Sequence, residues 1–359
     1  MSFPRSRRAL LLIAAGCLGL LLVPGASLLY EASAGQSCTR CHEIRQSYDV
    51  WRNSSHRGMD CKECHGGLLT LDVSFHTGNL RRLSRHLRAG VPERVEIRNR
   101  DVGRLMERCQ GCHREEFAQW QSGPHSATYA RIFLDVTDNQ KRRLMEDCLR
   151  CHGMFFDGGI RDLVAPLNTA GPWRLIRPEL AEQPAIPCLA CHAMHRDGVP
   201  LKRRQPQVVQ AAAGQELFRP SLALFDIRTR EHLPTAYLPL PEIREGSRPV
   251  KMSPDRRQAL CYQCHAPLAT WQVRSGDDRT PVGVHEGFSC LACHQKHSQQ
   301  TRASCADCHP RLSNCGLDVE KMDTTFRSPK SPHNIHFVKC ADCHPKGVPP
   351  KRGQKRVAD

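Results

Sequence analysis

The chain begins with one long apolar segment and shows no regular hydrophobic pattern of that length afterwards. Residues 9–30 form an apolar run, and Arg5, Arg7 and Arg8 precede it. A run of about 20 apolar residues spans a bilayer, and a positive flank is retained on the cytoplasmic side. The pattern therefore predicts an N-terminal membrane anchor that places the rest of the chain on the outer side.

Two other interpretations of this segment stay open. Ala32-Ser33-Ala34 is an Ala-x-Ala site at which a signal peptide can be cleaved, which would release a soluble periplasmic protein. Cys17 loosely matches a lipoprotein acylation site, although too much apolar sequence follows it. In an anchor, Cys17 would be a small apolar helix residue.

Beyond the apolar run, the pattern favours short helices and loops. Residues 104–109 and 141–148 have helical spacing, and no long stretch alternates as a strand does. Residues 201–255 contain seven prolines, which argues against long helices and predicts an extended connector or a haem-covering loop. The predicted fold class is mostly α with extensive loops.

The cysteines follow a single repeated motif. Eighteen of the 20 cysteines lie in nine copies of Cys-x-x-Cys-His, whereas a shuffled chain of this composition would contain about 0.06 copies. The motif residues are Cys38, Cys41, His42; Cys61, Cys64, His65; Cys109, Cys112, His113; Cys148, Cys151, His152; Cys188, Cys191, His192; Cys261, Cys264, His265; Cys290, Cys293, His294; Cys305, Cys308, His309; and Cys340, Cys343, His344.

This spacing is the one that covalent haem attachment requires. Two thiols three positions apart can each form a thioether to one haem, and the adjacent histidine then becomes the proximal iron ligand. Zinc sites and disulfide frameworks also use paired cysteines, but neither needs a histidine after every second cysteine. The sequence therefore predicts nine covalently bound haem c groups and no nucleotide cofactor.

Haem changes the meaning of the charge and composition. The formal charge of +16 would ordinarily favour nucleic acid or anionic lipid. Nine haems add eighteen propionates, which brings the total to about −2 when all are ionised, so nucleic acid is excluded as a partner. With only 6% aromatic residues, the protein core is expected to be thin, with haem faces supplying apolar surface.

The motifs cluster along the chain, and the clusters predict domains. An anchor or signal peptide at 1–34 precedes a two-haem module at 35–103 and a three-haem module at 104–200. The haem-free, Pro-rich connector at 201–255 leads to a four-haem module at 256–347 and a basic tail at 348–359.

Ten histidines outside the motifs are candidates for the second, distal iron ligand. Ten spare histidines for nine irons are typical of bis-histidine haems, which have no open position and favour electron transfer. Histidines that lie in repeated contexts or directly before a motif are the first candidates. His333 and His76 come next, and His86 and His232 are the weakest candidates. The predicted distal ligands are His56, His125, His195, His285, His297, His336, His333 and His76.

Two stretches resemble known families. Cys38–Ile44, Tyr48–Trp51, Ser54-Ser55-His56 and Cys61–His65, just after an apolar segment, resemble the start of the NapC/NirT family of membrane-anchored quinol dehydrogenases, over about residues 1–90. That resemblance implies membrane quinol as the electron donor. Ile44 stands where some members carry a methionine ligand.

The rest resembles the multihaem superfamily of pentahaem nitrite reductase and hydroxylamine oxidoreductase. Trp120–His125 and His285–Cys290 carry the resemblance, but the Cys-x-x-Cys-Lys catalytic haem of that nitrite reductase is missing. The resemblance therefore implies a shared architecture and no recognised active site.

The sequence thus predicts a periplasmic electron carrier with redox partner proteins, anchored through its N-terminal helix. The alternative is a multihaem oxidoreductase acting on a small nitrogen or sulfur compound; a structural role for the haem stack is a third. The catalytic residues of such an oxidoreductase are unknown, and the polar loop 276–283 and Cys315 are the candidates. The ordinary interpretation of the loop is a structural or propionate-binding loop, and that of Cys315 is a plain buried thiol.

Overall fold

A computed structural model describes most of the chain between residues 36 and 298. The described residues are 9–14, 16–18, 28, 32–33, 36–40, 42–65, 81, 84–88, 97–195, 222–265, 280–298, 336 and 346. Contacts divide the chain into two units, unit 1 (Met1–Arg114 with Met194–Lys202) and unit 2 (Glu115–Ala193 with Arg203–Asp359). The two units are defined by contacts between residues and do not test the domain boundaries given above, which stay predictions.

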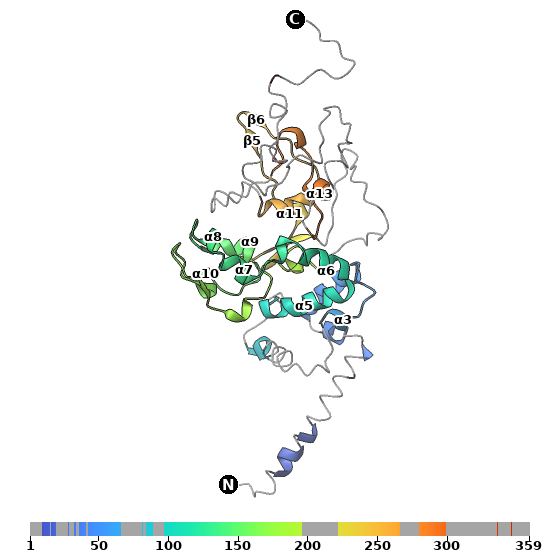
Figure 1. Cartoon of the computed structure of the whole chain (residues 1–359). Coiled ribbons are helices and arrows are strands. Elements are labelled where there is room, and N and C mark those ends of the chain that lie inside the picture. The colour runs from blue at the N-terminus through green and yellow to red at the C-terminus, as the bar shows by residue number, and fades with distance from the viewer. Residues whose placement is uncertain are drawn as a thin grey trace. The chain divides into compact units, whose positions relative to one another are not determined.

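Unit 1 is built from short helices that carry haem motifs (Figure 1). Its elements are η1 (Gln36–Arg40), α2 (His42–Arg52), α3 (Cys61–His65) and α5 (Asn99–Cys112). α2 contacts η1, and α3 contacts α5. The predicted helix at 104–109 is confirmed, because α5 contains it and runs directly into the motif at 109–113.

No helix among the described residues has the length and hydropathy needed to cross a membrane. Of the apolar run 9–30, the structure describes only residues 9–14, 16–18 and 28, which are helical.

Within the residues that the structure describes, unit 2 contains short α- and 3-10 helices with three small sheets. Its helices are α6 (Arg114–Gln121), η2 (Pro124–Ser126), α7 (Tyr129–Phe133), α8 (Val136–Asn139), η3 (Glu146–Cys148), α9 (Leu149–His152), α10 (Ile160–Leu163), η4 (Pro178–Leu180), η5 (Cys188–Ala190), η6 (Thr235–Tyr237), α11 (Gln258–Tyr262), η8 (Gly283–His285) and α13 (Cys290–Cys293). Its strands are β1 (Val164–Ala165), β2 (Arg174–Leu175), β3 (Ala223–Asp226), β4 (Glu231–Pro234), β5 (Arg244–Glu245) and β6 (Arg248–Pro249). The mostly α fold with extensive loops is confirmed.

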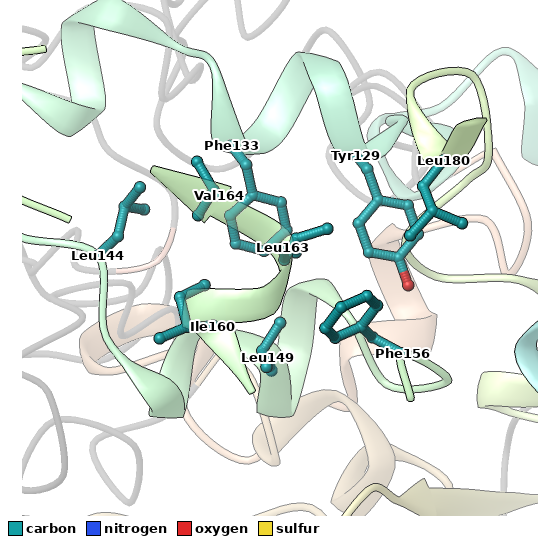
Figure 2. Close-up of a cluster of buried hydrophobic side chains, with 9 residues drawn as sticks. All are labelled: Tyr129, Phe133, Leu144, Leu149, Phe156, Ile160, Leu163, Val164 and Leu180. Atoms are coloured by element: carbon teal, nitrogen blue, oxygen red, sulfur yellow. The ribbon is translucent and has the colours of Figure 1, made fainter. Parts of the chain in front are cut away.

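One apolar cluster forms the core of unit 2 around the motif at 148–152. Side chains from α7, α9, α10, β1 and η4 converge there, as Figure 2 shows. Leu149, inside the motif itself, is 1% exposed. The cluster consists of Tyr129, Phe133, Leu144, Leu149, Phe156, Ile160, Leu163, Val164 and Leu180.

The predicted helix over 141–148 is wrong except at its end. Only Glu146–Cys148 is helical, as the 3-10 turn η3. Leu144 turns into the apolar cluster, and its N–H donates to the carbonyl of Leu167 at 3.2 Å. Met145 is extended, with φ −146° and ψ 167°. This tertiary contact outweighs the local helix propensity.

The described part of the Pro-rich segment forms two hairpins. β3 pairs with β4 over four residues, and β5 with β6 over two. The first hairpin is attached to the haem motif at 188–192, because the Ala223 N–H donates to the Cys191 carbonyl at 3.1 Å. His232, on β4, bonds through Nε2 to the Leu189 carbonyl at 2.7 Å. This part of the segment therefore supports a haem motif.

Candidate haem-binding sites

Four of the described motifs share the same helical turn. The N–H of the motif histidine donates to the carbonyl of the first cysteine, four residues earlier, in the motifs at 109, 188, 261 and 290, at 2.8, 3.0, 2.9 and 2.9 Å. The motif at 61 lies within α3, and the one at 148 ends in α9. One turn of helix places residues i and i+4 on the same face, so the first cysteine and the histidine point to one side.

Five motif histidines each face a histidine from outside their own motif. The pairs, with the distances between ring centroids, are His65–His195 at 5.9 Å, His113–His56 at 6.2 Å, His265–His125 at 6.1 Å, His192–His297 at 6.2 Å and His294–His336 at 6.2 Å. The first two pairs lie within unit 1 and the other three within unit 2.

This separation fits an iron atom between the two rings. A metal–imidazole bond is about 2.0–2.1 Å long and the nitrogen lies about 1.1 Å from the ring centre, so rings on opposite sides of one iron have centroids about 6.2 Å apart. All five pairs fall within a few tenths of an ångström of the value for iron. The residues present therefore fit bis-histidine haem.

His195 carries the second bond that metal-binding histidines ordinarily make. Its Nδ1 lies 2.9 Å from the carbonyl oxygen of Ser47 on α2. A carbonyl only accepts, so Nδ1 carries the proton and Nε2 keeps its lone pair. That bond fixes the tautomer and the orientation of the ring, which is the usual role of such a partner at a metal site.

His56 is positioned by Ser54, two residues before it. Ser54 is 5% exposed, donates its hydroxyl to the Trp51 carbonyl at 2.8 Å and accepts the His56 N–H at 3.1 Å. Burial, and then the neighbouring His113, lower the pKa of His56. The neutral imidazole, which is the form that binds metal, is thereby favoured. Ser54 thus links Trp51 to His56 and fixes the turn that carries the histidine.

The motif cysteines of the described sites are thiols in the structure, without disulfide bonds. They are Cys61, Cys64, Cys109, Cys112, Cys148, Cys151, Cys188, Cys191, Cys261, Cys264, Cys290 and Cys293. Burial raises the pKa of Cys188, and that of Cys191 to about 12. Such thiols stay protonated at neutral pH.

Cysteines of different motifs meet in unit 2. The Cys261 thiol hydrogen-bonds to that of Cys290, which raises the pKa of Cys261 and lowers that of Cys290. The Cys264 thiol bonds likewise to Cys151, and this bond together with burial raises the pKa of Cys264. Several attachment sites of this unit are therefore immediate neighbours.

A buried ion pair that the sequence did not single out lies beside two motifs. Asp255 and Arg257 side chains are 4% and 3% exposed, with Nη2 and Oδ2 at 2.8 Å. The same Oδ2 accepts the Ser289 hydroxyl at 2.8 Å, and Ser289 caps α13 at the Leu291 N–H. Burial raises the pKa of Asp255, but the bonds from Arg257 and Ser289 outweigh it, so this pKa is lowered overall.

The remaining candidates stay predictions. His285 ends η8 with its ring 6.1 Å from that of Phe288. His152 ends α9 beside the apolar cluster. The motifs at 305 and 340, with His76, His333, Cys315 and most of the loop 276–283, lie outside the described residues; so do Cys41 and the side chains of Cys38 and His42.

Two stretches of the chain match models of known families. Residues 247–310 match cytochrome c7 and related cytochrome c, and residues 108–160 match cytochrome c554 and c-prime. The two stretches contain five of the nine motifs, those at 109, 148, 261, 290 and 305. No curated protein and no solved structure matches the chain.

Proposed function

We propose that this chain, a multihaem c-type cytochrome in electron transfer, binds nine haem c groups and relays electrons through them on the periplasmic side of the cytoplasmic membrane. The observation that carries the proposal is the set of five histidine pairs at 5.9–6.2 Å. The nine motifs supply the count.

A histidine on each side of the iron determines what such a site can do. When bound, haem iron supplies a one-electron Fe(II)/Fe(III) couple. His56, His125, His195, His297 and His336 would hold the iron from the side opposite the motif histidines that their rings face. At these five sites they would exclude a small molecule from the metal and leave outer-sphere electron exchange as the available chemistry.

The N-terminal segment supports membrane quinol, or a membrane partner, as the electron source. Cys38 is eight positions after Tyr30, so the chain can span at most about 28 Å between the apolar run and the first motif. An anchored protein would hold that attachment site near the bilayer surface, where quinol is accessible. Electrons would then pass outward to a redox partner protein. Arg81, Arg85 and Arg88 would favour anionic headgroups.

Mass spectrometry and spectroscopy of the intact protein test the relay. The denatured protein should carry the mass of nine haems, and the oxidised protein should be low-spin and bind neither cyanide nor nitrite. A mass below eight haems would show that the motifs overstate the count. A high-spin signal that responds to nitrite would favour the oxidoreductase alternative instead.

Fractionation with N-terminal sequencing tests the location. A retained anchor leaves the apolar run in the mature protein and keeps it in the membrane fraction through a salt wash. A mature chain that begins at Gly35 and washes off in salt would refute the membrane-quinol proposal, although a periplasmic carrier would still be consistent with that result.

A further inference from the structure

Two haem-attachment motifs are followed by a second histidine at the same short distance. Cys-Leu-Ala-Cys-His, then two residues, then another histidine, occurs at residues 188–195 and again at 290–297. The second histidine of the first copy, His195, faces His65, and that of the second copy, His297, faces His192. In both copies the second histidine therefore faces the histidine of a different motif.

The second copy lies within unit 2, as do both of the histidines that it faces. The N–H of His294 donates to the Cys290 carbonyl at 2.9 Å, at the end of α13 (Figure 1). The ring of His294 lies 6.2 Å from that of His336, and the ring of His297 lies 6.2 Å from that of His192. Two histidines three positions apart thus face two different partners.

Both partner histidines are held by the backbone of unit 2. His192 forms an antiparallel bridge with Leu222, directly before β3. The carbonyl of His336 accepts the N–H of Val282 at 2.7 Å. The two rings that face this segment therefore have fixed attachment points in the fold.

The segment itself is held by a side-chain hydrogen bond. Ser298 is 3% exposed, and its hydroxyl donates to Oε1 of Gln295 at 2.8 Å. This bond closes the turn at residues 296–298, which carries His297. The position of His297 is therefore set by a bond in which no histidine ring takes part.

We propose that residues 294–297 bridge two irons: His294 binds the haem iron of its own motif and His297 binds that of the motif at 188, so these two haems exchange electrons directly. The proposal rests on the proposed function. Three residues span at most about 11 Å and a histidine binds an iron about 6–7 Å from its Cα, so the two irons lie within about 24 Å of each other. In each exchange one ferrous iron becomes ferric and its neighbour becomes ferrous, without proton transfer or bond breaking.

Nitric oxide bound at the two irons measures their separation. His297→Ala opens the iron of the site at 188 and His336→Ala opens that of the site at 290, so each variant of the reduced holoprotein should gain one ferrous nitrosyl and the double variant two. Ferrous bis-histidine haems are diamagnetic and do not interfere. Pulsed dipolar EPR of the double variant should therefore give a separation of no more than about 24 Å.

The outcomes separate the bridge from the relay. A double variant that gains a single nitrosyl, or one whose two nitrosyls lie clearly farther apart than the segment allows, would overturn the bridge while leaving the relay intact. A nitrosyl signal in the wild-type protein would instead contradict the bis-histidine relay of the proposed function.

Ser298→Ala provides a milder variant that alters no cysteine and no iron ligand. It should shift the low-spin EPR signal of the oxidised site at 188, which is the signal lost in His297→Ala, and leave unchanged the signal of the site at 290, lost in His336→Ala. Ser247→Ala, at an exposed serine between β5 and β6, is the control and should shift neither signal. An unshifted signal at 188, or a shift confined to the site at 290, would overturn the role of Ser298 as a positioning residue for His297.

Discussion

The buried Asp255–Arg257 pair allows a quantitative test of how the chain holds its last described motif. Asp255 accepts from Arg257 Nε and Nη2 at 2.8 Å each and from Ser289 at 2.8 Å. Asp255→Asn removes the negative charge that faces the buried Arg257 guanidinium. Breaking a buried pair in this way costs about 3–5 kcal/mol. At about 2–4 °C per kcal/mol for a unit of 150–250 residues, we expect the Tm to fall by about 6–20 °C.

The chain provides a matched control with the same Asp-x-Arg spacing. Asp226 and Arg228 side chains are 17% and 71% exposed, at 3.8 Å, and Asp226 accepts the Arg228 N–H as Asp255 accepts that of Arg257. Exposed pairs contribute about 0–1 kcal/mol, so Asp226→Asn should leave Tm almost unchanged. Thermal unfolding of the holoprotein, followed by circular dichroism, compares the two variants. Equal small shifts would refute the argument from burial.

The pH dependence follows from the direction of the pKa shift. The pKa of Asp255 is lowered in the folded protein, so its contribution is fully present above the unfolded value of about 3.9 and is lost as the pH falls through the folded pKa. The Tm difference between wild type and Asp255→Asn should therefore persist from pH 7 to about pH 4 and shrink below it. A difference that shrinks between pH 7 and pH 5 would assign the effect to another group.

Two further predictions concern individual haem sites. The ring planes of His56 and His113 are 79° apart, whereas those of the three described pairs in unit 2 are 19–31° apart. We therefore expect the site at 109 to contribute a strongly anisotropic low-spin EPR signal, which His56→Met should remove and His297→Met should leave in place. Leu149→Ala removes a side chain that is 1% exposed and should lower the free energy of unfolding by about 2–5 kcal/mol, measured by denaturant unfolding. Leu291→Ala, at the same motif position but only half-buried, should lower it less. Equal losses would contradict the placement of the apolar cluster at 148–152.

The sequence identified the attachment residues because their chemistry is local. A cysteine, a second cysteine and a histidine within five positions form one helical turn whatever the rest of the chain does, as at 109–113 and 290–294. The candidates His56, His125 and His195 were also found from repeated contexts. Which iron each one faces could not be predicted, because residue 125 meets residue 265 and residue 195 meets residue 65 only after the chain has folded.

Features that depend on burial were missed for a related reason. Asp255-Arg-Arg257 resembles an ordinary surface charge cluster, and only its 3–4% exposure and its contact with Ser289 show that it supports a motif. Lys141–Cys148 has helical spacing, yet Leu144 is drawn into the apolar cluster and its N–H bonds to Leu167. Both outcomes depend on contacts with residues distant in the sequence, which a local sequence pattern does not reveal.

The histidine pairs also explain how a chain with so few aromatic residues can hold a fold. In the described residues one apolar cluster of nine side chains is centred on the motif at 148–152. Elsewhere each bis-histidine iron would join two distant segments as a cross-link does. A cross-link that closes a loop of about 100 residues contributes about 4–5 kcal/mol by restricting the unfolded chain. The His125–His265 pair closes a longer loop and the His294–His336 pair a shorter one, so loss of the first should destabilise the protein more. The metal sites that move electrons are, by this reasoning, the same contacts that define the fold.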